Sequence, residues 1–169
     1  WQPRFTPSRL PLLNQRWVVL PDVPIRDAGA HYPGRSQFGA RWNHVGAGFE
    51  YSLSCFDGFN HLPLLEPQVE LNPLRVYLTR RYPRMRMYGA DAAVPLKWFT
   101  VKAETAWFTS RTGAADEYAL YVVQVERQAG EWFVVGGYAG EAVTKARERL
   151  DFAPDRGLAR ACLLYTSPS

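Results

Sequence analysis

The stretch FTVKAETAWFT, residues 99–109, decides the fold because its side chains alternate in character along its length. Successive side chains of a strand point to opposite faces, so Phe99 and Trp107 share an apolar side. Lys102 and Glu104 share the other side, which carries charge. The length matches the roughly 9 to 11 residues of a tilted strand that crosses a bilayer, and an aromatic residue stands near each end. The pattern predicts a strand of a membrane-spanning barrel.

A soluble antiparallel sheet with one solvated face produces the same alternation. The alternation alone favours that soluble sheet, whereas the aromatic residues at both strand ends favour the membrane strand. The mean hydropathy of −0.28 does not separate the two, because only alternate residues of a barrel strand face lipid. No run of about 18 apolar residues occurs, so the sequence predicts no transmembrane helix.

Composition and charge exclude several other classes of function. Aromatic residues at 14%, with 13 Gly and 13 Pro, fit strands and loops better than long helices. The net charge of +4 comes from basic residues scattered among acids, so we expect no nucleic-acid binding. Cys55 and Cys162 lie far apart in sequence, which predicts neither a zinc site nor a structural disulfide. The chain begins at Trp1 without a signal peptide, so we expect the start of any exported precursor to lie outside it.

Alternation recurs along most of the chain after residues 1–36, a proline-rich segment that we expect to be irregular. Residues 57–73 read as a loop, and Pro83 marks either a bulge or a turn. Residues 142–150 are mostly charged and predict a loop with one helical turn, before a new strand near Leu158. The other predicted strands are residues 38–45, 49–56, 74–82, 84–94, 118–127 and 132–140.

The predicted fold class is all-β, an antiparallel up-and-down meander of about six or seven strands that forms part of a transmembrane β-barrel. Single-chain bacterial barrels start at about eight strands, so we expect that this chain does not close by itself. Residues 37–161 would form the partial barrel.

Three segments carry a resemblance to a known group: residues 38–42 (FGARW), 51–59 (YSLSCFDGF) and 87–93 (MYGADAA). Together they resemble the large porin-like outer-membrane barrels of Gram-negative bacteria, which include alginate-export-like channels. The similarity spans roughly residues 35–160 and is a pattern of strands and turns. It implies an outer-membrane location and passive transport, and it assigns no individual substrate-binding residue.

The C-terminal residues 162–169 (CLLYTSPS) resemble translated sequencing-adapter sequence at the end of an assembled fragment. We therefore expect a non-native tail there, and the alternative is a natural edge strand over residues 161–165. If the tail is foreign, Cys162 carries no information about redox compartment.

Charged and polar positions predict the surface of a water-filled lumen. Lys102 and Glu104 are the strongest candidates, because they can pair with Glu126 and Gln124 on a neighbouring strand. The densest basic cluster could attract anions or sugars, or it could be ordinary solvent exposure or lipopolysaccharide contact. That cluster contains Arg75, Arg81, Arg84 and Arg86, interleaved with tyrosines. The residues predicted to line the lumen are Arg41, Glu50, Arg75, Tyr77, Lys102, Glu104, Gln124 and Glu126.

The sequence predicts no enzyme. It holds no Gly-x-Ser-x-Gly motif, and His31, His44 and His61 lack a patterned nucleophile or carboxylate partner. We therefore expect no catalytic residue, no cofactor and no metal. An outer-membrane enzyme is disfavoured for the same reason.

The leading hypothesis is a fragment of an outer-membrane channel for passive passage of small polar or anionic solutes. Its expected contacts are membrane lipid, lipopolysaccharide and the solutes, and it could form homo-oligomers. The alternative is a soluble β-barrel that binds an apolar ligand in its interior, as lipocalins do. In that case the apolar faces point inward and Lys102 and Glu104 point outward.

Overall fold

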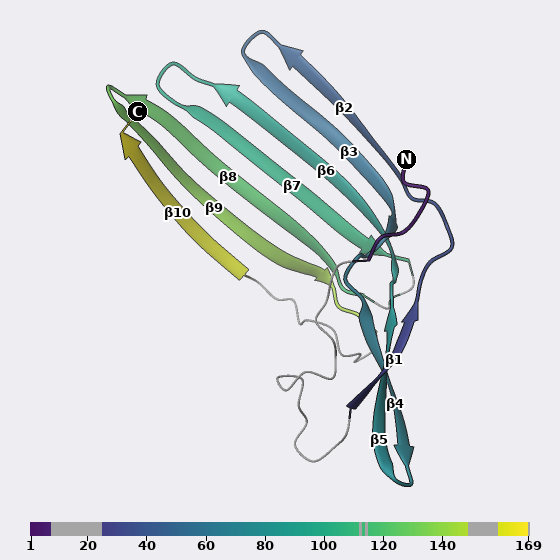
Figure 1. Ribbon diagram of the computed structural model, residues 1–169. Coiled ribbons are helices and arrows are strands. Elements are labelled where there is room, and N and C mark those ends of the chain that lie inside the picture. Colours follow the sequence, from purple (N-terminus) through teal and green to yellow (C-terminus); the bar gives the residue numbers. More distant parts are fainter. Residues whose placement is uncertain (8–24, 112, 114, 149–158, 169) are drawn as a thin grey trace.

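The large sheet contains seven strands, all paired antiparallel (Figure 1). The computed structural model describes residues 1–7, 25–111, 113, 115–148 and 159–168, and for 159–168 only the backbone. The strands lie in the order β10-β9-β8-β7-β6-β3-β2, which is a meander with one insertion between β3 and β6. Their bounds are β2 Phe38–Gly46, β3 Phe49–Phe59, β6 Arg84–Pro95, β7 Thr100–Ser110, β8 Glu117–Ala129, β9 Trp132–Lys145 and β10 Ala159–Pro168.

Two tight turns explain why neighbouring strands form hairpins. Gly46 pairs with Phe49, so only two residues connect β2 to β3, and Gly48 has a φ of 91°. The β8–β9 turn is built the same way, with Gly130 at a φ of 65°. Glycine adopts this left-handed conformation without the steric cost that other residues incur, so these glycines permit the turns. The predicted all-β antiparallel meander is confirmed.

The insertion between β3 and β6 contributes two of the three strands of a second, smaller sheet with the order β1-β5-β4. β4 (Leu64–Leu71) and β5 (Leu74–Arg81) make a hairpin, and β1 (Ile25–His31) pairs parallel with β5. Figure 1 shows this sheet projecting from one end of the large sheet. Its small apolar core contains Val76 and Leu78, against which Ile25 and Leu65 pack.

Three parts of the sequence prediction are wrong. β1 lies inside residues 1–36, which were expected to be irregular, and β4 lies inside the expected loop 57–73. Pro67 is tolerated in β4 because β4 is an edge strand, where a missing N–H leaves no ladder partner unsatisfied. β9 continues to Lys145, so the described residues up to Glu148 contain no helical turn.

Packed aromatic rings join the two sheets. Tyr82, between β5 and β6, is buried, and its ring lies 4.7 Å from that of Phe5 and 5.7 Å from that of Tyr32 between centroids. Burial raises the pKa of the Tyr82 hydroxyl, and the neighbouring Tyr32 adds to the effect. Gln37 is fully buried and accepts a hydrogen bond from the Phe59 backbone N–H at 3.0 Å. The insertion is therefore anchored where it leaves the large sheet.

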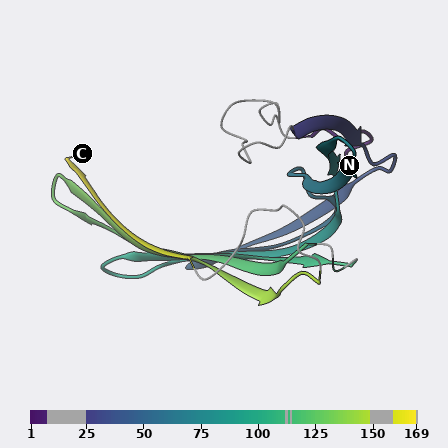
Figure 2. The same cartoon turned by 90° about the horizontal axis from the view of Figure 1, so that it is seen from below.

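The large sheet is a single curved layer (Figure 2). Among the described residues, the buried apolar side chains are Leu64, Val76, Leu78, Tyr82 and Tyr118, none of them in the middle of this sheet. Leu53 and Val123 on one face are exposed, and so are Lys102 and Glu104 on the other. Both faces of the central sheet are therefore uncovered in the described structure. The described residues also include no helix that could span a membrane.

Candidate functional site

Strand register assigns each side chain of the large sheet to one of two faces, since directly opposed residues point to the same side. Ser52 on β3 opposes Asp91 on β6, and Asp91 in turn opposes Glu104 on β7. Glu50 belongs to the same side, because it opposes Ala93, which in turn opposes Lys102. This side is called the polar face, and its middle contains the polar side chains Arg41, Asn43, Glu50, Ser52, Asp91, Lys102, Glu104, Gln124 and Glu126. The register also places the exposed Val45, Leu120 and Val122 on it.

The other side is uncharged over β2, β3 and β6 to β9 in the middle of the sheet. One row runs Trp42, Leu53, Ala90, Thr105, Tyr121 and Gly140 across six strands. The apolar face, as defined by this register, contains Trp42, His44, Phe49, Tyr51, Leu53, Tyr88, Ala90, Ala92, Val101, Ala103, Thr105, Trp107, Tyr121, Val123, Val125 and Tyr138. These residues form the middle of the face and include no Asp, Glu, Lys or Arg. The same register places Asp57, Arg84, Arg86 and Arg127 toward the ends of this face, and it places Arg160 of β10 opposite Gly140.

Aromatic side chains stand near both ends of the apolar face. Near the β2–β3 turn, Trp42 and Tyr51 pack edge to face with centroids 5.4 Å apart. Toward the opposite end, the rings of Tyr88 and Trp107 lie 6.1 Å apart. Trp107 is 43% exposed, yet its indole N–H donates to the Thr144 hydroxyl at 3.2 Å. An aromatic ring with a satisfied polar edge suits the boundary between an apolar layer and water.

A hydrogen-bonded cluster ties β2, β3 and β6 together on the polar face. The Arg41 Nη2 lies 2.9 Å from the Asp91 Oδ2, and the Ser52 hydroxyl also donates to this carboxylate. The Arg41 Nε donates to the Ser52 Oγ and to the Asn43 Oδ1, both at 3.0 Å. One carboxylate therefore receives two donors from two other strands.

A second cluster joins β7 to β8. The Lys102 Nζ lies 2.7 Å from the Glu126 Oε1, and the Gln124 amide donates to the same oxygen at 2.6 Å. The predicted pairing of Lys102 with Glu126 is confirmed. Gln124 contributes by binding Glu126, and no bond from Gln124 to Lys102 is present.

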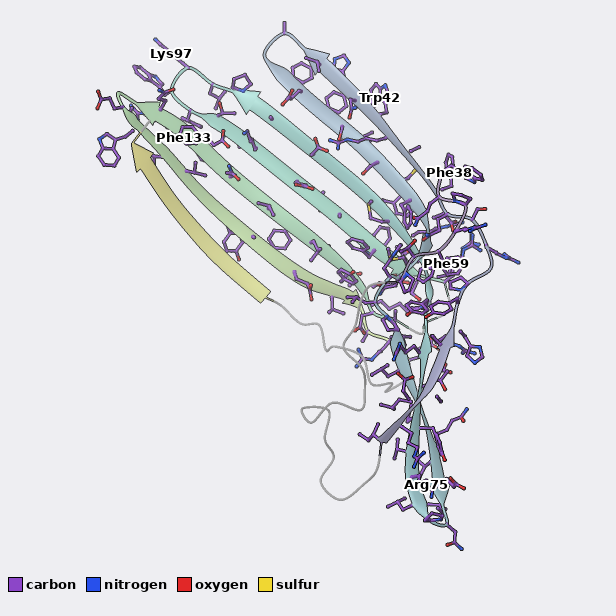
Figure 3. All side chains as sticks on the ribbon, viewed as in Figure 1. Phe38, Trp42, Phe59, Arg75, Lys97 and Phe133 are labelled. Carbon is purple, nitrogen blue, oxygen red and sulfur yellow. The ribbon has the colours of Figure 1, made fainter. Side chains whose placement is uncertain are left out.

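An open hollow of about 420 Å³ lies on the polar face between the two clusters. Five of the residues predicted to line a lumen border it: Arg41, Glu50, Lys102, Glu104 and Gln124. A sixth predicted residue, Glu126, does not border the hollow but binds Lys102 and Gln124. The remaining two, Arg75 and Tyr77, lie on β5 in the small sheet, and Figure 3 shows Arg75 near the far tip of that sheet. The structure does not bring these two to the hollow, because the β4–β5 hairpin leaves the large sheet.

The prediction omitted Asp91, which also lines the hollow and is the acceptor of the first cluster. Asp91 is the only charged residue in the stretch 87–95, and that isolation in an otherwise uncharged segment was the available signal. Its partner Arg41 lies 50 positions away in sequence, beyond the inserted hairpin.

The arginine-rich stretch is divided between the two sheets, and three of its four arginines bind carboxylates. Arg84 and Arg86 bind Asp57 at 2.7 and 2.8 Å, and Arg81 binds Glu66 at 2.8 Å. Arg75 opposes Glu70 across β4 and β5. None of the four arginines borders the hollow on the polar face.

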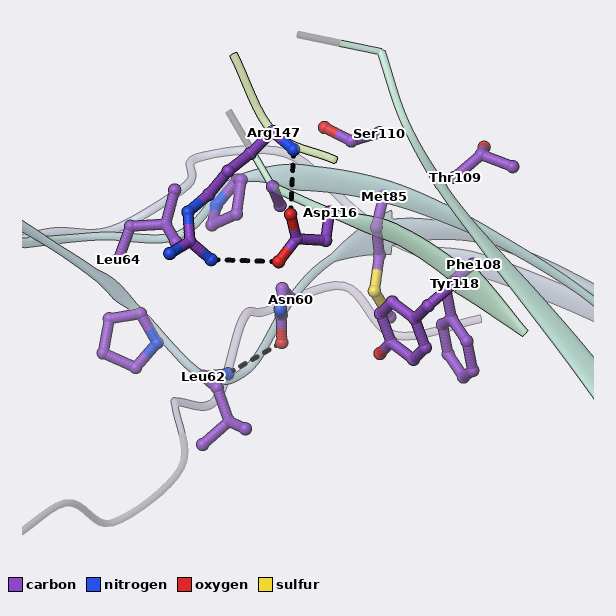
Figure 4. A pocket seen from close by; sticks show the side chains of 13 residues that line it. Asn60, Leu62, Leu64, Met85, Phe108, Thr109, Ser110, Asp116, Tyr118 and Arg147 are labelled. Atoms are coloured by element: carbon purple, nitrogen blue, oxygen red, sulfur yellow. Dashed lines mark hydrogen bonds and ion pairs between the residues drawn. The ribbon is translucent and has the colours of Figure 1, made fainter. Parts of the chain in front are cut away.

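A smaller pocket of about 50 Å³ lies at the joint between the sheets (Figure 4). Leu64, Met85 and Tyr118 contribute to its lining. At one side the Arg147 Nη1 binds the Asp116 Oδ2 at 2.9 Å, with the two side chains only 10% and 9% exposed. The Arg147 backbone N–H also donates to Asp116 at 2.8 Å. This pair fixes the end of β9 to the β7–β8 loop.

No family model, curated protein or solved structure matches this chain. Among the residues that the structure describes, no group of three or more His, Cys, Asp or Glu side chains could hold a metal ion. The two faces of the large sheet are thus the features from which function can be inferred.

Proposed function

We propose that the large sheet is part of the wall of a porin-like β-barrel in a bacterial outer membrane. The apolar face contacts lipid, and the polar face lines a passage for small polar solutes that move down their gradient. The supporting observation is one layer of strands with an exposed face whose middle, over β2, β3 and β6 to β9, carries no charge, opposite a face with charges in its middle. A closed barrel satisfies the backbone hydrogen bonds of every strand within hydrocarbon, as lipid requires.

The energetics favour lipid on the apolar side. Soluble monomers rarely expose contiguous apolar patches beyond a few hundred Å². Here Leu53, Val123 and Tyr138 on the apolar face are 51%, 44% and 40% exposed. A membrane would remove them from water. On the lipid side at the bilayer midplane, the charge of Lys102 would cost about 2–4 kcal/mol and that of Glu104 would cost less.

The aromatic side chains near both ends of the apolar face fit the same arrangement, because membrane barrels carry aromatic girdles at both interfaces. Phe99 near one end and Phe38 near the other are 39% and 60% exposed. Asp57 directly opposes Phe38 across β2 and β3, and it binds Arg84 and Arg86. Such charges fit the headgroup region, where lipopolysaccharide is a matching partner.

One observation favours a second function, a soluble barrel that binds an apolar ligand. The apolar face carries its own open hollow of about 350 Å³, with Leu53, Ala90, Thr105 and Tyr121 among its lining residues. If the apolar face pointed inward, this hollow would become part of a ligand cavity, and Lys102 would point to bulk water.

Ala92 and Ala93 provide a matched test, because they are neighbours on β6 that belong to opposite faces. In the full-length protein without Cys55 and Cys162, each alanine is replaced by cysteine and modified with a bulky charged thiol reagent in a planar bilayer. We expect Ala93→Cys to lose conductance on modification and Ala92→Cys to keep it. A fluorophore on Ala92→Cys should be quenched by doxyl-labelled lipid in vesicles. A soluble, non-conducting protein whose Ala92→Cys label escapes quenching would reject the channel.

A further inference from the structure

The charges around the hollow on the polar face are not balanced. The polar face has two cationic side chains, Arg41 and Lys102, and each already binds a carboxylate, Asp91 at 2.9 Å and Glu126 at 2.7 Å. Both cations are therefore compensated locally by their own partners. Their fields contribute little attraction for an anion in the hollow.

Two further carboxylates, Glu50 and Glu104, border the same hollow. Neither forms an ion pair with any residue that the structure describes. Glu104 directly opposes Asp91 across β6 and β7, and Arg41 binds Asp91 and not Glu104. The uncompensated charge at the hollow is consequently negative.

We infer that this wall selects cations over anions, with Glu50 and Glu104 as the residues that determine the selectivity. The inference rests on the proposed channel function. Acidic side chains lining a pore raise the local concentration of cations, and low-dielectric walls focus that field into the lumen. The arginines that suggested anion passage contribute little to this field, because the register places Arg84 and Arg86 on the opposite face and neither borders the hollow.

The test measures zero-current potentials of the full-length protein in planar bilayers under a KCl gradient. We expect the unmodified protein to show the sign of K⁺ preference. Replacing both residues (Glu50→Gln with Glu104→Gln) should lower the K⁺-to-Cl⁻ permeability ratio by about twofold or more. The control is Glu70→Gln, which removes the same charge from the small sheet, where Glu70 accepts a bond from Tyr77 at 3.1 Å.

A second measurement needs no variant. Raising ionic strength from about 0.1 M to about 1 M shortens the screening length from about 10 Å to about 3 Å, so the K⁺ preference of the unmodified protein should shrink. The inference would be overturned if the channels preferred Cl⁻, or if neither salt nor the double variant changed the K⁺-to-Cl⁻ permeability ratio. Either result would still be compatible with the proposed channel function. Absence of any conductance would overturn the channel itself.

Discussion

Asp91 and Glu104 oppose each other directly across β6 and β7, two carboxylates in register on the polar face. Like charges at this position repel and destabilise a sheet. The Arg41 guanidinium and the Ser52 hydroxyl both bind Asp91 and offset part of that repulsion. Glu104 forms no ion pair with any described residue, so the repulsion on its side is offset only by solvent.

Neutralising Glu104 should therefore stabilise the sheet. We expect Glu104→Gln to raise the free energy of unfolding by about 0.5 kcal/mol, the scale of a cross-strand charge pair. Glu50→Gln is the control, because Glu50 opposes the uncharged Ala93 and should change stability less. Urea unfolding of the protein in detergent micelles measures both. Equal effects of the two substitutions on the free energy of unfolding would contradict a repulsion between Asp91 and Glu104.

Removing the Lys102 ammonium should have the opposite effect. Glu126 has a side chain only 17% exposed, and Lys102→Met would leave it with the Gln124 amide alone. We expect a loss of about 1 kcal/mol in the free energy of unfolding. Lys97→Met in the β6–β7 turn, where the ammonium lies 5.4 Å from the Trp98 ring centroid, should cost less. The charge swap Lys102→Glu with Glu126→Lys should recover most of the loss, and failure to recover would argue against a direct pair.

The strands of the large sheet could be predicted because alternation and glycine turns act locally. β6 and β7 follow their predicted bounds within one or two residues. β1 and β4 could not be predicted, since β4 contains Pro67 and both are edge strands that β5 holds in place. β1 pairs with a segment that is distant in sequence, since Ile25 opposes Val76, and local sequence does not encode that pairing. β4 forms a local hairpin with β5, and Pro67 conceals it from a strand pattern.

The same limit applies to the site. Lys102 and Glu126 could be matched because β7 and β8 are consecutive, and a short loop constrains their register. The contact between Arg41 and Asp91 depends on β3 pairing with β6, across the inserted β4–β5 hairpin. Arg75 failed to join the hollow for the same reason. The alternation of side chains along a strand assigns each residue to a face, but it does not predict which sheet that strand joins.

A side chain at Gly140 should displace the Tyr121 ring that opposes it. The Tyr121 ring covers this glycine so closely that a Cβ would overlap the ring. We expect Gly140→Ala to lower the free energy of unfolding by about 1–2 kcal/mol. Gly137→Ala, whose Cβ would meet its nearest atom at 3.5 Å, is the matched control on the same strand. Adding Tyr121→Ala should remove most of the stability loss caused by Gly140→Ala. If the losses in the free energy of unfolding of the two single variants simply added in the double variant, the overlap would be refuted.

Burial should make the Asp116–Arg147 pair worth more than the exposed pair on the polar face. Removing one partner of a buried pair costs about 3–5 kcal/mol, so Asp116→Ala should destabilise strongly. Asp116→Asn should cost less, because its amide oxygen can still accept from the Arg147 backbone N–H.

The comparison for this prediction is Asp91→Ala, since the side chains of Arg41 and Asp91 are 59% and 39% exposed. Exposed pairs contribute about 0–1 kcal/mol, and removing Asp91 also relieves its repulsion with Glu104. Urea unfolding should therefore rank Asp116→Ala as the most damaging, then Asp116→Asn, then Asp91→Ala. If Asp91→Ala matched Asp116→Ala, solvent exposure would not control the strength of these pairs, and the polar face would be as dry as the joint between the sheets.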